Sequence, residues 1–179
     1  MSETLQTKYE ILCRIRSDIN EHLPILYNLA SRYSHVTEFG VRHAVSTTAL
    51  LAGLESRKDH SKLISYDINR QPQVAELEQL TDKVEFIFHQ ENTLEVEIAS
   101  TDLLFIDTLH NYEQLKQELK QSTNVKSQIV LHDTTTFGIN GETSEVGLTR
   151  AITEFLENSR WKLAHYYPNN NGLTILERS

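Results

Sequence analysis

The sequence predicts an α/β fold in which a doubly wound, mostly parallel sheet of seven strands carries helices on both faces. Short runs rich in Val, Ile, Phe and Tyr alternate with stretches of helical periodicity. Parallel strands need the crossover connections that such helices provide. The last two runs are joined only by PNNNG at 168–172, which is too short for a crossover, so they predict an antiparallel hairpin at a sheet edge.

Residues 5–31 predict two short helices, because apolar side chains recur every three or four residues and Pro24 interrupts the pattern. We therefore expect one domain, made of a helical N-terminal extension at 1–34 and an α/β core at 35–179. The expected strands are 35–39, 63–67, 84–88, 102–107, 127–133, 161–167 and 172–177. The expected helices of the core are 46–54, 71–80, 93–99, 112–121 and 148–156.

The composition is that of an ordinary globular protein, with 39% hydrophobic and 23% charged residues. A net charge of −8 disfavours nucleic acid and anionic membranes as partners and leaves a small-molecule substrate as the expected one. The single cysteine, Cys13, excludes an intramolecular disulfide. No apolar run approaches the ~18 residues that span a bilayer, and the N-terminus does not resemble a secretion signal, so we expect a cytoplasmic protein. Association into a homo-oligomer is left open.

Acids and histidines follow several of the predicted parallel strands, at the sheet edge where open α/β folds bind ligands. EFGVRHAVSTTALL at 38–51 places Gly40 where the backbone can approach a ligand, and Ser46 or Thr47 where a side chain can cap the next helix. Asp67 ends the second strand, where an acid can bind ribose hydroxyls. These features predict a nucleoside ligand, whereas the lack of a GK[ST] motif argues against a P-loop NTPase. The alternative is that Glu38 and Asp67 only cap loop ends.

The segment 38–51 resembles the first motif of class I S-adenosylmethionine-dependent methyltransferases, which have a Rossmann-like fold. Four later segments are similar, in order and spacing, to blocks of the small bacterial O-methyltransferases and cephalosporin-hydroxylase-like proteins, a branch that includes sugar and macrolide O-methyltransferases. These segments are FIDTLHNYEQLKQEL (105–119), IVLHDTTTFG (129–138), GLTRAITEFLE (147–157) and NNNGLTIL (169–176). The resemblance spans residues 35–177 and implies S-adenosylmethionine as the cofactor, without identifying the substrate.

The resemblance also implies which residues contact the cofactor. Asp67 would hold the ribose, and Gly40 would lie against the methionine moiety. Ala44 stands where the family commonly has a second glycine, so its methyl group is expected to crowd the cofactor tail and to be absorbed by a small backbone shift. The complete implied set is Glu38, Gly40, Val41, Ser46, Asp67 and, near the adenine amine, either Glu91 or Asn92.

Metal-dependent members of the resembled families hold a divalent ion at positions that correspond to Asp107, His132 and Asp133. Mg²⁺ or Mn²⁺ bound there would stabilise the alkoxide that attacks the methyl group. The imidazole of His132 suits Mn, Fe, Co, Ni or Zn better than Mg. In the alternative, His132 belongs to a hydrogen-bond network and no metal binds.

His110 lies where the catechol type of this superfamily places a catalytic lysine. With an ordinary pKa of about 6.5 it is a candidate general base, and Asp107 is the second predicted catalytic residue. Alternatively, His110 anchors its loop beside Tyr112. The polar segment 134–145 is predicted to be a lid, or else a simple connector.

Together these features predict an S-adenosylmethionine-dependent methyltransferase that methylates an oxygen of a small hydroxylated molecule, such as a sugar, with or without a divalent metal. The alternative is a noncatalytic binding or assembly module that keeps the fold and the nucleoside cofactor. Ala44 and His132 suggest this alternative, because both depart from the pattern of the resembled family.

Overall fold

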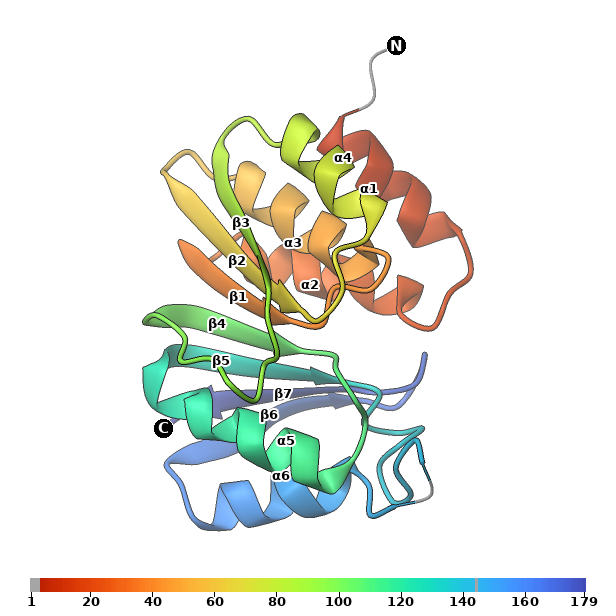
Figure 1. Ribbon diagram of the computed structural model, residues 1–179, viewed down its shortest axis with the longest axis vertical. Coiled ribbons are helices and arrows are strands. Elements are labelled where there is room, and N and C mark those ends of the chain that lie inside the picture. Colours follow the sequence, from red (N-terminus) through yellow and green to blue (C-terminus); the bar gives the residue numbers. More distant parts are fainter. Residues whose placement is uncertain (1–3, 144) are drawn as a thin grey trace.

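The computed structural model describes residues 4–143 and 145–179, so the first three residues of the predicted extension and residue 144 of the predicted lid lie outside it. Its sheet has the strand order β3-β2-β1-β4-β5-β7-β6 (Figure 1). Strands β1 to β5 are parallel, and β7 runs antiparallel to both β5 and β6. The predicted doubly wound sheet with a C-terminal hairpin is confirmed. The strands are β1 (His35–Phe39), β2 (Ser61–Asp67), β3 (Val84–Gln90), β4 (Thr101–Ile106), β5 (Val125–His132), β6 (Trp161–Tyr167) and β7 (Leu173–Arg178).

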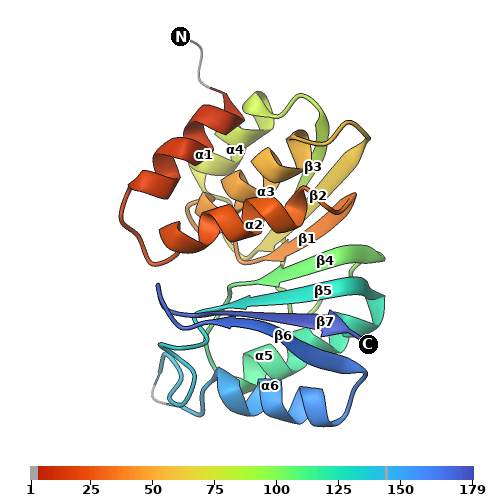
Figure 2. The ribbon, with the colours of Figure 1, turned by 180° about the vertical axis from the view of Figure 1, so that it is seen from behind.

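Helices cover both faces of the sheet (Figures 1 and 2). One face carries α1 (Leu5–Arg14), α2 (Leu23–Ala30), α3 (Val45–Glu55) and α4 (Pro72–Leu80). The other face carries α5 (Tyr112–Glu118) and α6 (Leu148–Glu157). Two short 3₁₀ helices, η1 (Asn20–His22) and η2 (Leu119–Asn124), precede α2 and follow α5. No helix within the described ranges combines the length and apolar character that a membrane crossing requires.

The N-terminal helices are two, as expected, but the break between them lies before Pro24. Helix α1 ends at Arg14, whereas Pro24 sits in the first turn of α2. A proline is tolerated there because the N–H that it lacks would have no partner within the helix. Both helices pack against α3 and extend the apolar layer on that face of the sheet.

The connection from β3 to β4 contains no helix, so the helix expected at 93–99 is wrong. The Asn92 side chain accepts a hydrogen bond from the Leu94 amide at 3.1 Å, and only a single turn follows it, at 93–95. Further along, Gln121 donates to the Val96 carbonyl at 2.7 Å and accepts from the Ile98 amide at 3.3 Å. Gln121 of η2 thus supplies hydrogen-bond partners for the backbone of this loop. The apolar side chains of the loop pack on the face of the sheet that carries α5 and α6.

Candidate functional site

Three adjoining pockets open at the carboxyl ends of the parallel strands. The β2 pocket has a volume of about 450 Å³ and lies beside Asp67. The central pocket, of about 580 Å³, lies beside His110, and the α3 pocket, of about 360 Å³, lies beside Ser46. Arg42 and Asp107 line all three. One continuous ligand can therefore occupy the β2 and α3 pockets while a second molecule sits in the central pocket.

The loop between β1 and α3 is built from left-handed backbone. Gly40, Arg42 and Ala44 have φ angles of 86°, 46° and 58°. Only glycine adopts such angles without strain, so the Cβ atoms of Arg42 and Ala44 are held there at a cost. Ala44 is itself the residue that precedes the first turn of α3, and it is buried. The family's second glycine thus corresponds to a position whose backbone conformation suits glycine.

Ser46 does not cap α3, contrary to expectation. It lies inside the first turn, and its hydroxyl donates to Glu38 Oε1 at 2.7 Å. Ser65 donates to the other oxygen of Glu38 at 2.6 Å. Burial raises the pKa of Glu38 to about 7 even though these hydroxyls favour the charged form. Glu38 is fully buried, so in the described structure it joins α3 to β2 beneath the pockets rather than lining one of them.

Asp67 holds the β1–α3 loop closed. Its Oδ2 atom accepts hydrogen bonds from the Val41 and Arg42 amides at 2.8 and 2.9 Å, and its Oδ1 atom accepts from the Asn69 amide at 2.8 Å. A carboxylate has about four acceptor positions, so Oδ1 keeps capacity for one more donor. Asp67 lines the β2 pocket and is placed to bind a hydroxyl there.

The structure distinguishes between the two candidates after β3. Asn92 lines the β2 pocket, whereas Glu91 is exposed and lies 3.5 Å from His89. The same pocket is bordered by three exposed apolar side chains, Ile68, Leu94 and Leu109. Apolar side chains at the mouth of a pocket suit a flat aromatic ligand group.

His110 lies among three carboxylates. Its Nε2 atom is 2.9 Å from Asp133 Oδ2 and 3.2 Å from Asp107 Oδ1, and its Nδ1 atom is 3.0 Å from Glu142 Oε2. The ring stacks on Phe137 with 4.8 Å between centroids. Burial lowers the pKa of His110, but Asp107 and Asp133 outweigh it and raise the pKa to about 10. These contacts favour the imidazolium form of His110, and they are the contacts of a loop anchor.

The four residues predicted to carry the chemistry come together in the structure. The ligand atoms of Asp107, His110 and Asp133 lie within 4.8 Å of one another, and we call these residues the site trio. His132 lies beneath the trio, with its Nδ1 atom 3.3 Å from Asp107 Oδ1 and 3.6 Å from Asp133 Oδ1. The His132 side chain is 1% exposed and the His110 side chain is 16% exposed, so His110 is the more accessible of the two histidines.

The trio has the chemistry of a divalent-metal site. Two carboxylates and one imidazole suit Mn, Fe, Co, Ni or Zn. Asp133 Oδ1 is buried without a hydrogen-bond partner among the described residues, and its ion-pair contact is His132 Nδ1 at 3.6 Å. A metal and the His110 proton would compete, since both take the Nε2 lone pair.

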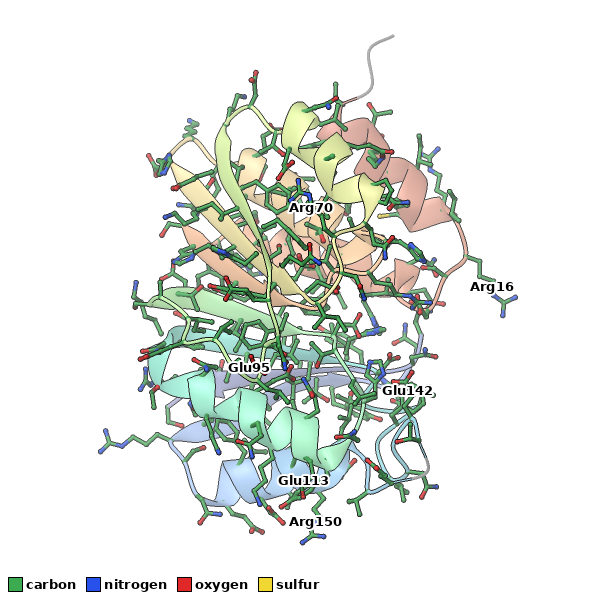
Figure 3. All side chains as sticks on the ribbon, in the orientation of Figure 1. Arg16, Arg70, Glu95, Glu113, Glu142 and Arg150 are labelled. Atoms are coloured by element: carbon green, nitrogen blue, oxygen red, sulfur yellow. The ribbon has the colours of Figure 1, made fainter. Side chains whose placement is uncertain are left out.

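The segment predicted to be a lid lies over His110. The Glu142 amide donates to the His110 carbonyl at 3.0 Å, and Glu142 projects from the loop after β5 (Figure 3). The Tyr112 amide donates to the Val146 carbonyl at 2.8 Å, which ties the end of the loop to α5. The loop is therefore docked on the central pocket and contributes Glu142 and Phe137 to its wall.

Sequence reasoning missed two residues next to the site. His22 is fully buried, and its ring packs edge-on against His132 with 5.5 Å between centroids. Burial and the nearby charge of His132 lower the pKa of His22 to about 4. Asp18 forms an ion pair with Arg42 at 2.9 Å across the pocket mouths. Both residues come from the segment before α2, and no local pattern marks them, because only the packing of that segment on the sheet edge brings them here.

Residues 37–134, which include the β1–α3 loop and the trio, match a family model described as a methyltransferase domain. The chain belongs to this methyltransferase family. No curated protein matches the chain in sequence. The resemblance to class I S-adenosylmethionine-dependent methyltransferases is thereby confirmed at the level of family and fold.

Solved structures with this fold include both O- and N-methyltransferases. The methyltransferase PaMTH1 of Podospora anserina, bound to S-adenosylhomocysteine, is 17% identical, with coverage of 100% of this chain and 89% of that one and a TM-score of 0.64. The O-methyltransferase TomG of Streptomyces achromogenes, in complex with S-adenosylmethionine, is 15% identical, with coverages of 100% and 91% and a TM-score of 0.64. The N-methyltransferase NodS of Bradyrhizobium japonicum is 13% identical, with coverages of 98% and 99% and a TM-score of 0.63.

Proposed function

We propose that the protein binds S-adenosylmethionine and transfers its methyl group to an oxygen of a small hydroxylated acceptor. The observation that carries this proposal is that Asp107 and Arg42 line all three pockets. A cofactor that spans the β2 and α3 pockets has its sulfonium near their junction at Asp107. An acceptor in the central pocket then meets the methyl group beside the site trio.

Each pocket has features that suit one part of this arrangement. In the β2 pocket, Asp67 is the partner for ribose hydroxyls, and the apolar side chains at its mouth suit adenine. The α3 pocket adjoins the first turn of an eleven-residue helix, whose amides favour the carboxylate of the methionine tail. The central pocket contains polar side chains around Phe137, which suits a hydroxylated acceptor such as a sugar.

The trio supplies a way to orient the acceptor hydroxyl. Asp107 Oδ1 receives the hydrogen bonds of both His110 and His132, which leaves Oδ2 for the acceptor hydroxyl. The acceptor oxygen attacks the methyl carbon while the C–S bond breaks, the sulfonium becomes a neutral thioether, and the hydroxyl proton passes to the carboxylate. A divalent cation held by Asp107, His110 and Asp133 would stabilise the alkoxide as a Lewis acid. Alignment of the two reacting atoms contributes much of the acceleration.

Calorimetric titration with S-adenosylhomocysteine tests the cofactor, and release of that product in the presence of hydroxylated acceptors tests the reaction. We expect S-adenosylhomocysteine to bind, and NAD and ATP not to bind. A folded protein that does not bind S-adenosylhomocysteine would contradict the proposal. Binding without methyl transfer to any hydroxylated or amine acceptor, with and without Mn²⁺, would instead support the noncatalytic alternative.

A further inference from the structure

Glu118, the last residue of α5, is a carboxylate buried beneath the β2 pocket. Its exposed fraction is 1%. Its Oε1 atom lies 2.6 Å from Thr93 Oγ1 and 2.8 Å from Gln114 Nε2, and its Oε2 atom lies 2.8 Å from Thr108 Oγ1. Such a group is stable in the interior only when its oxygens are hydrogen-bonded. The three donors therefore have a role that goes beyond their own packing.

The three donors come from separate segments, and all of them line the β2 pocket. Thr93 belongs to the loop that replaces the expected helix after β3, Thr108 follows the trio residue Asp107, and Gln114 lies on α5. Glu118 lies behind these side chains and is absent from the lining of the pocket. One buried carboxylate thus holds one wall of the pocket together from behind.

An ionised carboxylate accepts hydrogen bonds and cannot donate them, and this fixes the polarity of the wall. Thr93 and Thr108 each have a single hydroxyl proton, which they give to Glu118, so their oxygens offer only lone pairs elsewhere. Gln114 must turn its amide nitrogen toward Glu118 and Thr93, at 2.8 and 3.2 Å. Its carbonyl oxygen is then turned away, and no residue in the described part of the chain donates to it.

We propose that Glu118 makes this wall of the β2 pocket an array of hydrogen-bond acceptors and so selects a ligand base that carries an amine, as adenine does, over one that carries a carbonyl at the same position. The inference rests on the proposed function, because it assumes that the adenosine moiety occupies the β2 pocket. Glu118 is a positioning residue here, since it acts through Thr93, Thr108 and Gln114.

Replacing Glu118 by Gln keeps the size of the side chain and exchanges one of its two acceptor oxygens for a donor nitrogen. The new amide can donate to Gln114 or to either hydroxyl. Gln114 is then free to turn its own nitrogen toward the pocket, and Thr93 and Thr108 are free to donate there. Loosening of the wall alone would weaken the binding of every ligand equally. The ratio of the affinities for an amine-bearing and a carbonyl-bearing ligand therefore shows whether Glu118 sets the polarity of the wall or only stabilises its structure.

The test compares S-adenosylhomocysteine with S-inosylhomocysteine, which has a carbonyl in place of the adenine amine, by calorimetric titration. Measurements are made at pH 8, because burial raises the pKa of Glu118 above its usual range and a higher pH favours the ionised carboxyl. We expect the wild-type protein to prefer the adenosyl ligand by about tenfold or more, because the carbonyl of the inosyl ligand leaves an acceptor of the wall unpaired, and we expect Glu118→Gln to lose most of this preference. Glu113→Gln is the matched control, because Glu113 is exposed on the same helix (Figure 3).

A Glu118→Gln protein that keeps the wild-type preference would overturn the inference, and so would a wild-type protein that binds both ligands equally. Neither result would affect the proposed cofactor. Failure of the wild-type protein to bind either ligand would overturn the proposed cofactor and this inference together. If Glu118→Gln does not fold, Gln114→Met removes the carbonyl acceptor while Glu118 stays in place, and it is expected to reduce the same preference.

Discussion

The backbone of Gly40 packs directly against the main-chain carbonyl of Asp107, so closely that a Cβ atom at Gly40 would overlap that carbonyl. The two residues follow neighbouring strands, β1 and β4, and the Asp107 amide donates to the Phe39 carbonyl at 2.8 Å. This contact fixes the position of the loop that borders the β2 and α3 pockets relative to Asp107, the first residue of the site trio. The positive φ of 86° at Gly40 is part of the same arrangement.

We expect Gly40→Ala to abolish binding of S-adenosylhomocysteine and to lower the free energy of unfolding. The left-handed conformation alone costs a non-glycine residue ~1 to 2 kcal/mol, and the overlap with the Asp107 carbonyl adds to this cost. Thermal melting and calorimetric titration measure the two effects. Ala44→Gly is the matched control in the same loop, since it relieves a positive φ, and it should fold and bind. Normal binding by Gly40→Ala would show that the close contact does not position the loop.

Asp67→Ala is expected to weaken binding of S-adenosylhomocysteine by roughly 1.5 to 3 kcal/mol, the range for hydrogen bonds to a charged group. Part of the loss comes from the ribose, and part from the Val41 and Arg42 amides, which lose their acceptor. Calorimetric titration of the folded variant measures the loss, and the exposed Asp82 provides the control Asp82→Ala. An affinity equal to that of the wild type would remove Asp67 from the cofactor site.

The charge on His110 should make stability depend on pH. Its pKa rises from an ordinary 6.5 to about 10 in the folded protein, so between these values the folded state binds more protons than the unfolded state. The stabilisation is therefore complete below about pH 6.5 and is lost as the pH rises through about 10. Melting temperatures of the wild type and His110→Gln, measured from pH 5 to 10, should converge toward alkaline pH. A constant difference between them would contradict the ion-pair contacts of His110.

The identity of the third residue in the trio can be tested by metal preference. His110→Asp replaces a nitrogen ligand by an oxygen, so activity that depends on a divalent ion should shift from Mn²⁺ toward Mg²⁺. His132→Asp should produce no such shift, because His132 lies beneath the trio. The assay is methyl transfer with each ion added after treatment with EDTA.

Two results would count against the metal. Activity of the wild type that persists in excess EDTA would show that no metal is needed. Ion-dependent activity that survives in both Asp107→Ala and Asp133→Ala would show that the metal binds elsewhere. A shift toward Mg²⁺ in His132→Asp alone would restore the ligand set suggested by the sequence.

Much of the fold is determined by local sequence. The alternation of β-branched runs with helical periods predicted the strand and helix order, and the short PNNNG link predicted the antiparallel hairpin. The missing helix at 93–99 shows where this reasoning ends. Its composition suits a helix, but the side chain of Gln121 satisfies its backbone in another conformation. Gln121 is distant in the sequence, so a local pattern cannot reveal its contribution.

The sequence by itself determined the family, the glycine turn and the residue types of the site, because these depend on motifs within short segments. The tertiary structure alone decided that His110 joins His132 against Asp107 and Asp133, since residues from two strand ends must meet before their distances are defined. It also decided the roles of Glu38 and Glu118. Two acids that look alike in sequence are both buried, and their partners come from neighbouring strands and loops. Burial and the direction of hydrogen bonds are properties of the packed chain, and they decide what each carboxylate does.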